Sequence, residues 1–203
     1  MELFLSNMIN SIMQIVLFVA IPLVWWILSA RKQISFLNWI GLKKVESFDK
    51  GSLFKWTGIT TAIFLFLSIF MLSMVSGVEK ATSDFTGLGL TALPAALIYA
   101  FLKTALSEEI LFRGFLLKRL SGKFGFQIGN AVQSILFGLT HGLMFVALVG
   151  AFKATLIILF TGAIGWSMGY INERKAGGSI LPGWLIHGIA NTFSALIAAF
   201  SII

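Results

Sequence analysis

The chain contains no cysteine, so it can form neither a disulfide nor a Cys-ligated metal site, and it has no thiolate nucleophile. Charged residues are also scarce, at 11% of the 203 residues, whereas hydrophobic residues make up 58%. The mean hydropathy is +0.94. Because soluble domains are about 25% charged and about half apolar, this composition predicts an integral membrane protein.

The apolar residues form long, nearly continuous runs rather than alternating with polar ones, which indicates helices and not the strands of a membrane barrel. A helix needs about 20 residues to cross a bilayer core of about 30 Å. The runs that are long enough lie at residues 9–30, 54–76, 91–117, 127–149, 153–171 and 179–203. The sequence therefore predicts an all-α bundle of about six transmembrane helices. We expect residues 1–203 to form a single membrane-embedded domain.

The basic residues collect in every second loop between these runs. Eleven of the 15 lysines and arginines lie in the first, third and fifth loops: Arg31, Lys32, Lys43, Lys44, Lys50, Lys55, Lys118, Arg119, Lys123, Arg174 and Lys175. The second and fourth loops hold only Lys80 and Lys153, and the tails hold none. Because cytoplasmic loops are rich in Lys and Arg, we expect both termini outside. The membrane topology then accounts for the net charge of +7, and we expect no nucleic-acid partner.

The third run is interrupted by charge in the stretch LSEEILFRGF, residues 106–115. An ionisable group inside a membrane span is costly unless it is paired, and it usually marks a functional site. On a helix, residues four apart share a face, so Glu109 can pair with Arg113, while Glu108 points about 100 degrees away. Glu108, left without that partner, can act as a general base.

The two histidines of the chain, His141 and His187, also lie inside predicted spans. Asn191 follows His187 by one helical turn, and Phe137 precedes His141 by one turn and can pack against its ring. Each polar residue alone can simply hydrogen-bond a neighbouring helix. Two glutamates, two histidines and an asparagine in spans that hold little else ionisable instead favour one shared site.

Three motifs contain these residues: EExxxR in EEILFR, FxxxH in FGLTH and HxxxN in HGIAN, in that order over residues 108–191. They resemble the motifs of the CAAX protease and bacteriocin-processing (Abi) family of intramembrane endopeptidases, which includes the type II CAAX prenyl endopeptidases. The resemblance places the functional core in residues 91–203. It implies a multi-pass protease of a bacterial cell membrane, in contact with lipids, whose site opens toward the cytoplasm.

The resemblance further implies a role for each motif residue. Glu108 activates a water with the help of His141, and His187 and Asn191 stabilise the oxyanion of the tetrahedral intermediate. Peptide hydrolysis needs such a base and such donors. The substrate is a peptide or protein, and prenylated CAAX ends, signalling-peptide precursors and bacteriocin leaders are all open alternatives.

In the same resemblance Glu109 and Arg113 hold the site together. It leaves open whether a metal takes part. Glu108, His141 and His187 form a set of two histidines and one carboxylate of the kind that binds zinc, whereas the chain has no HExxH motif. We therefore expect either no cofactor or Zn, with metal-free catalysis slightly favoured.

Other functions compete with this interpretation. The stretch GWSMG, residues 165–169, fits GxSxG and offers Ser167 as a nucleophile with His187 as its base, although the motif normally needs a strand-turn-helix elbow. A bacteriocin-immunity or peptide-binding membrane protein would bind a peptide without cleaving it. A small transporter could use Glu108 and the histidines as a proton relay, but the sequence shows no internal repeat.

Overall fold

The computed structural model describes residues 2–46 and 49–203, and in this part of the chain every regular element is helical. Five helices are long and apolar enough to cross a membrane. They are Glu2–Ser29 (α1), Lys50–Met74 (α3), Gly89–Phe124, Phe126–Arg174 (α7) and Leu181–Ala199 (α8). The prediction of an all-α membrane bundle is confirmed.

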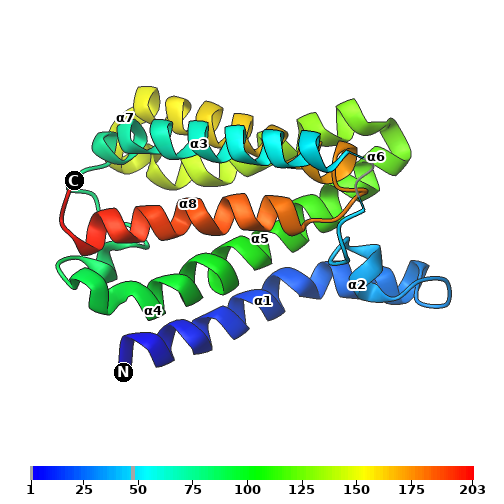
Figure 1. Ribbon diagram of the computed structural model, residues 1–203, viewed down its shortest axis with the longest axis horizontal. Coiled ribbons are helices and arrows are strands. Elements are labelled where there is room, and N and C mark those ends of the chain that lie inside the picture. Colours follow the sequence, from blue (N-terminus) through cyan, green and yellow to red (C-terminus); the bar gives the residue numbers. More distant parts are fainter. Residues whose placement is uncertain (1, 47–48) are drawn as a thin grey trace.

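The fourth and fifth predicted spans form one helical element, α7, that folds back on itself at Gly150. The backbone leaves helical geometry there, with φ 80° and ψ 162°, which glycine adopts without strain. The two halves then run antiparallel. The side-chain amide of Asn130, near the start of α7, donates to the carbonyl oxygen of Trp166, near its end, over 3.0 Å. Figure 1 shows α7 as a hairpin. The predicted crossings are thus present, two of them within α7.

Glycines let the two halves of α7 approach closely. A Cβ atom on Gly142 would lie 2.7 Å from the Ala154 carbonyl oxygen, and one on Gly138 would contact the Ile158 carbonyl oxygen. Small residues commonly permit such backbone contact in membrane bundles. The two halves of α7 are therefore in backbone contact at Gly138 and Gly142.

The charged third span is a composite helix that is longer than predicted. Its segments are η2 (Gly89–Ala92), α4 (Leu93–Leu97), η3 (Ile98–Leu106), α5 (Ser107–Glu109), η4 (Ile110–Leu117) and α6 (Lys118–Phe124). The segments η3 and η4 are wound as π-helix, a rare geometry that occurs often at functional sites. The basic stretch 118–124, expected as a loop, is helical, and the chain turns only at Gly125, whose φ is 84°.

The first basic loop packs into the bundle through the short helix α2 (Phe36–Trp39). Trp39 and Ile40 are buried in a cluster with Ile110 and Phe115 of η4. The first loop therefore packs against the charged helix through these apolar side chains.

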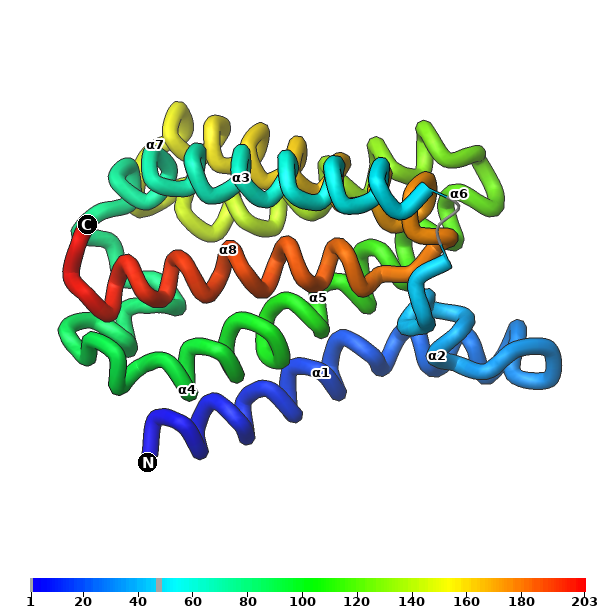
Figure 2. Tube along the Cα trace, viewed as in Figure 1, coloured from blue at the N-terminus to red at the C-terminus, as the bar shows by residue number. Residues whose placement is uncertain are grey.

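The helices are arranged around α8, which lies between the row of α3 and α7 and the row of α4, α5 and α1 (Figure 1). The two termini lie at the same end of the molecule, together with the connection between α3 and α4, which contains η1 (Ser83–Phe85). The connections around α2, around α6 and between α7 and α8 gather at the opposite end (Figure 2). The basic residues of the odd loops thus share one end.

Candidate functional site

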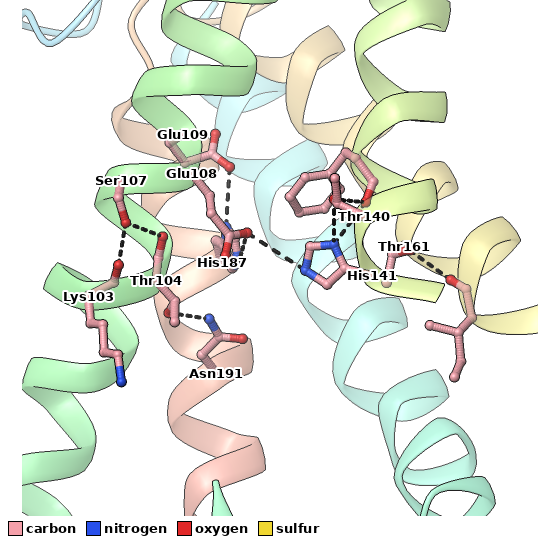
Figure 3. Close-up of polar contacts among 12 residues, drawn as sticks. Lys103, Thr104, Ser107, Glu108, Glu109, Thr140, His141, Thr161, His187 and Asn191 are labelled. Carbon is pink, nitrogen blue, oxygen red and sulfur yellow. Dashed lines mark hydrogen bonds and ion pairs between the residues drawn. The ribbon is translucent and has the colours of Figure 1, made fainter. Parts of the chain in front are cut away.

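Three helices bring four of the predicted residues together. Glu108 and Glu109 come from the short segment α5, where the composite helix regains α-helical winding between its two π-helical stretches. His141 comes from the first half of α7 and His187 from α8. Figure 3 shows the side chains of Glu108, His141 and His187 pointing toward one another.

Glu108 lies between the two imidazole rings. Its Oε2 is 3.7 Å from Nε2 of His141 and 3.7 Å from Nε2 of His187. Both distances are longer than a direct hydrogen bond, and Oε2 has no hydrogen-bond partner among the residues that the structure describes. The side chains of Glu108 and His141 are 16% and 30% exposed. Oε2 itself is buried, so the exposed part of the Glu108 side chain lies away from it, and this oxygen lacks a partner that a water or a substrate atom would supply.

Glu109 has different surroundings: it lies inside the protein, where Arg113 neutralises its charge. Its Oε1 is 2.9 Å from an Arg113 guanidinium nitrogen, and both side chains are 0% exposed. The same oxygen is 3.3 Å from Nδ1 of His187. When Nδ1–H donates to Glu109, the ring of His187 is fixed with Nε2 toward Glu108.

Phe137 packs against three polar groups of the cluster. Its ring centroid is 4.4 Å from that of His141 and 5.8 Å from that of His187, and the Arg113 guanidinium lies 4.1 Å above it. The carbonyl oxygen of Phe137 is 2.8 Å from Nδ1 of His141. A proton on that Nδ1 leaves Nε2 as an acceptor facing Glu108.

Asn191 lies farther along α8 and contacts another helix. Its Nδ2 donates to the hydroxyl oxygen of Thr104 over 2.6 Å, so it links α8 to η3 below Glu108 (Figure 3). The amide has a second N–H, which that bond does not use. The structure thus places Asn191 on the His187 face of α8 but pairs it with Thr104.

Sequence reasoning missed two polar residues near the cluster. Thr104, the partner of Asn191, stands four residues before Glu108, and this same-face spacing could have indicated it. Asn172 is fully buried near the end of α7, and its Oδ1 accepts from the Gly183 N–H in the first turn of α8 over 2.9 Å. No motif contains Asn172, so only its position within an apolar run could have suggested it.

The serine alternative finds no support in the geometry. Ser167 donates its hydroxyl to the Ala163 carbonyl oxygen of its own helix, over 3.0 Å. Within residues 2–46 and 49–203 no hydrogen bond joins Ser167 to His187. The structure therefore does not form a Ser-His dyad.

In the expected zinc ligand set, the Nε2 atoms of both histidines face the same oxygen, Oε2 of Glu108. A zinc ion would need its three ligand atoms at about 2.0–2.2 Å from one point. Among the described residues, no group of three His, Asp or Glu side chains has an arrangement that could hold a metal ion. As they lie here, Glu108, His141 and His187 do not fit zinc, and we derive no catalytic step through a metal.

Comparison with known proteins gives one match. The family model described as "Type II CAAX prenyl endopeptidase Rce1-like" matches residues 89–193, just over half of the chain. The matched range contains all three motifs, from Glu108 to Asn191. Neither the curated proteins nor the solved structures gave a match.

Proposed function

The chain belongs to the Rce1-like family of type II CAAX prenyl endopeptidases, and from this premise we propose that it hydrolyses a peptide bond with a water activated by Glu108. The family makes it a multi-pass membrane protease of peptides or proteins. The proposal adds which residues carry the reaction. It treats residues 1–203 as one membrane-embedded domain with its catalytic core in residues 91–203.

One observation carries the proposal: the Oε2 atom of Glu108 is 3.7 Å from both imidazole Nε2 atoms, while the neighbouring Glu109 is neutralised by Arg113. A water held at Oε2 is positioned for deprotonation because His141 Nε2 can accept its other hydrogen. The water oxygen attacks the carbonyl carbon, and Glu108 takes its proton. When the C–N bond breaks, Glu108 delivers that proton to the leaving amine.

The negative charge on the carbonyl oxygen needs donors during the attack. In the proposal His187 provides one of them in its doubly protonated form, with Nδ1–H donating to the Glu109 carboxylate and Nε2–H to the carbonyl oxygen. The second N–H of Asn191 is the other donor, with the amide held in place by its bond to Thr104. Both donors belong to α8, so the position of that helix sets the geometry of the oxyanion site.

The decisive experiment compares Glu108→Gln with Ser167→Ala in purified protein reconstituted into lipid vesicles. Gln keeps the size of the side chain but cannot accept a proton, so Glu108→Gln should fold and lose cleavage by about 10²- to 10⁴-fold. Ser167→Ala should cleave like the wild-type protein. Cleavage by Glu108→Gln at the wild-type rate would refute the assignment.

Cleavage assays in the same vesicles distinguish the alternative substrates. Fluorogenic peptides that end in a prenylated CAAX sequence are compared with the unprenylated peptide and with a bacteriocin leader peptide. We propose a membrane-associated substrate, because the cluster lies on helices that span the bilayer. A protein that binds these peptides but cleaves none would instead match the bacteriocin-immunity or peptide-binding alternative.

A further inference from the structure

Two buried polar atoms behind the Glu108 cluster have no hydrogen-bond partner among the described residues: Oε2 of Glu109 and Nδ2 of Asn172. Both residues are fully buried. The other carboxylate oxygen, Oε1, is already engaged by Arg113 and His187. A buried carboxylate oxygen and a buried amide nitrogen are each costly when left unpaired.

These two atoms lie close to each other, and both pack against the bare Cα of Gly183. A Cβ atom built on Gly183 would lie 2.6 Å from Oε2 of Glu109 and 2.7 Å from Nδ2 of Asn172. The carboxylate oxygen only accepts hydrogen bonds, and the amide nitrogen only donates them. The two groups are therefore complementary, and they can lie this close together because Gly183 has no side chain.

The orientation of the Asn172 amide follows from a neighbouring bond. The backbone N–H of Gly183 is a donor, so the atom of Asn172 that it contacts at 2.9 Å must be the acceptor Oδ1. The other amide atom, which lies close to Oε2 of Glu109, is then Nδ2. Asn172 thus has two separate tasks: Oδ1 caps the first turn of α8, and Nδ2 faces Glu109.

We propose that Asn172 is a positioning residue for the reaction: its Nδ2 donates to Oε2 of Glu109 through one water, because the two atoms form no direct hydrogen bond in the structure. This bridge fixes the rotation of the Glu109 carboxylate, which keeps Oε1 on His187. His187 is thereby held with Nε2 toward Glu108. Asn172 acts through Glu109 and touches no substrate atom. The inference rests on the proposed function, in which Glu108 and His187 act on the peptide bond.

The test is Asn172→Asp, which separates the two tasks of this residue. An aspartate keeps an oxygen acceptor for the Gly183 N–H, so the cap of α8 is preserved. It replaces the donor that faces Glu109 by a second acceptor. Because a displacement of about 1 Å can cost about 10²-fold in rate, we expect kcat to fall by about 10- to 100-fold with KM within about twofold.

The matched control is Asn130→Ala. Asn130 is a fully buried asparagine of the same element, α7, and its amide bonds to the Trp166 carbonyl oxygen and not to the cluster. Its removal should lower the thermal stability and leave kcat per folded molecule unchanged. An Asn172→Asp enzyme with wild-type kcat overturns the inference, because the residue then serves only as a helix cap.

Asn172→Ala keeps the test decisive if Asn172→Asp does not fold. Asn172→Ala removes both the cap and the donor, so at a temperature where it is folded an unchanged kcat overturns the inference. A kcat at least about 10-fold below the wild-type value supports the inference when Asn130→Ala, at a comparable loss of stability, keeps its kcat. Wild-type protein and Glu108→Gln are measured in parallel. Cleavage that survives Glu108→Gln refutes the proposed function, whereas loss in Glu108→Gln with a normal Asn172→Asp enzyme refutes only the role of Asn172.

Discussion

At the scale of single residues, the adjacent carboxylates Glu108 and Glu109 show how one helical step separates two roles. Glu109 is 0% exposed and forms an ion pair with Arg113, so its charge belongs to the interior of the bundle. Glu108 is 16% exposed and faces two imidazole rings without a direct hydrogen bond. A proton acceptor must be free to bind a reactant, and of the two carboxylates Glu108 is the one that no arginine holds in an ion pair.

This difference predicts opposite effects on stability. Glu109→Gln leaves Arg113 as a buried charge without its partner, which should lower the free energy of unfolding by about 3–5 kcal/mol. Glu108→Gln should change the unfolding temperature little. The double variant Glu109→Leu with Arg113→Met should regain most of the lost stability without regaining cleavage. Thermal unfolding in detergent micelles measures all three, and equal losses for the two glutamine variants would contradict the division of roles.

Metal removal tests the chemistry of the same residues. Because Glu108, His141 and His187 lack the arrangement of a zinc site, we expect exhaustive chelation to leave the cleavage rate unchanged. Elemental analysis of the treated protein must show that less than about one zinc per ten chains remains, which leaves little metal to support the rate. A rate that falls with the zinc content and returns on adding zinc back would reverse this expectation.

Much of the cluster could be predicted from spacing, because residues four apart on a helix share a face. The pairing of Glu109 with Arg113 and the packing of Phe137 on His141 depend on that rule alone. The individual hydrogen bonds between helices could not be predicted from spacing. The bond from Asn191 to Thr104 depends on the relative height of two helices, which no periodicity in either segment encodes.

At the scale of elements, the hairpin of α7 fixes the height of His141 relative to α8. Its two halves contact each other through glycines, and Gly142 follows His141 directly. The sequence indicated two separate spans because each half of α7 is apolar and long enough to cross a membrane. The helical stretch 118–124 was missed for a related reason: its lysines and arginine suggested a loop, although they are good helix formers.

The glycine contact predicts a sharp contrast between two substitutions. A side chain at position 142 would collide with the Ile158 side chain and with the Ala154 carbonyl oxygen, so Gly142→Val should cost about 1–3 kcal/mol or more of stability. Gly58 of α3 is the control, because a Cβ there meets nothing within 4 Å and Gly58→Val should cost little. Equal unfolding temperatures for the two variants would show that the α7 halves do not pack as described.

At the scale of the whole molecule, the basic connections are tied to one another as well as gathered at one end (Figure 2). Lys118 of α6 is 2.5 Å from a Glu173 carboxylate oxygen at the end of α7 and donates to the Gly178 carbonyl oxygen over 2.7 Å. The N–H of Ile180 donates to the Gly41 carbonyl oxygen of the first loop over 2.8 Å. These bonds make one rigid, positively charged end.

That charged end determines the orientation we propose, with the termini outside and the basic connections in the cytoplasm. Moving one elementary charge against a membrane potential of 100 mV costs about 2.3 kcal/mol, so exporting a cluster of positive charges is strongly unfavourable. Because the chain has no cysteine, single cysteines report the orientation without background. Four exposed and uncharged positions suit the test: Ser6 and Ser76 at one end, and Gln33 and Gln127 at the other.

A membrane-impermeant maleimide added to intact bacterial cells should label Ser6→Cys and Ser76→Cys, and it should label Gln33→Cys and Gln127→Cys only after the cells are lysed. The reverse pattern would place the basic end outside, and the site could then not open toward the cytoplasm. Labelling of Ser6→Cys without Ser76→Cys would contradict the fold itself, because the structure places the start of α1 and the connection after α3 at the same end of the bundle (Figure 1). The first two labelling patterns therefore decide the orientation of the protein, and the third tests its fold.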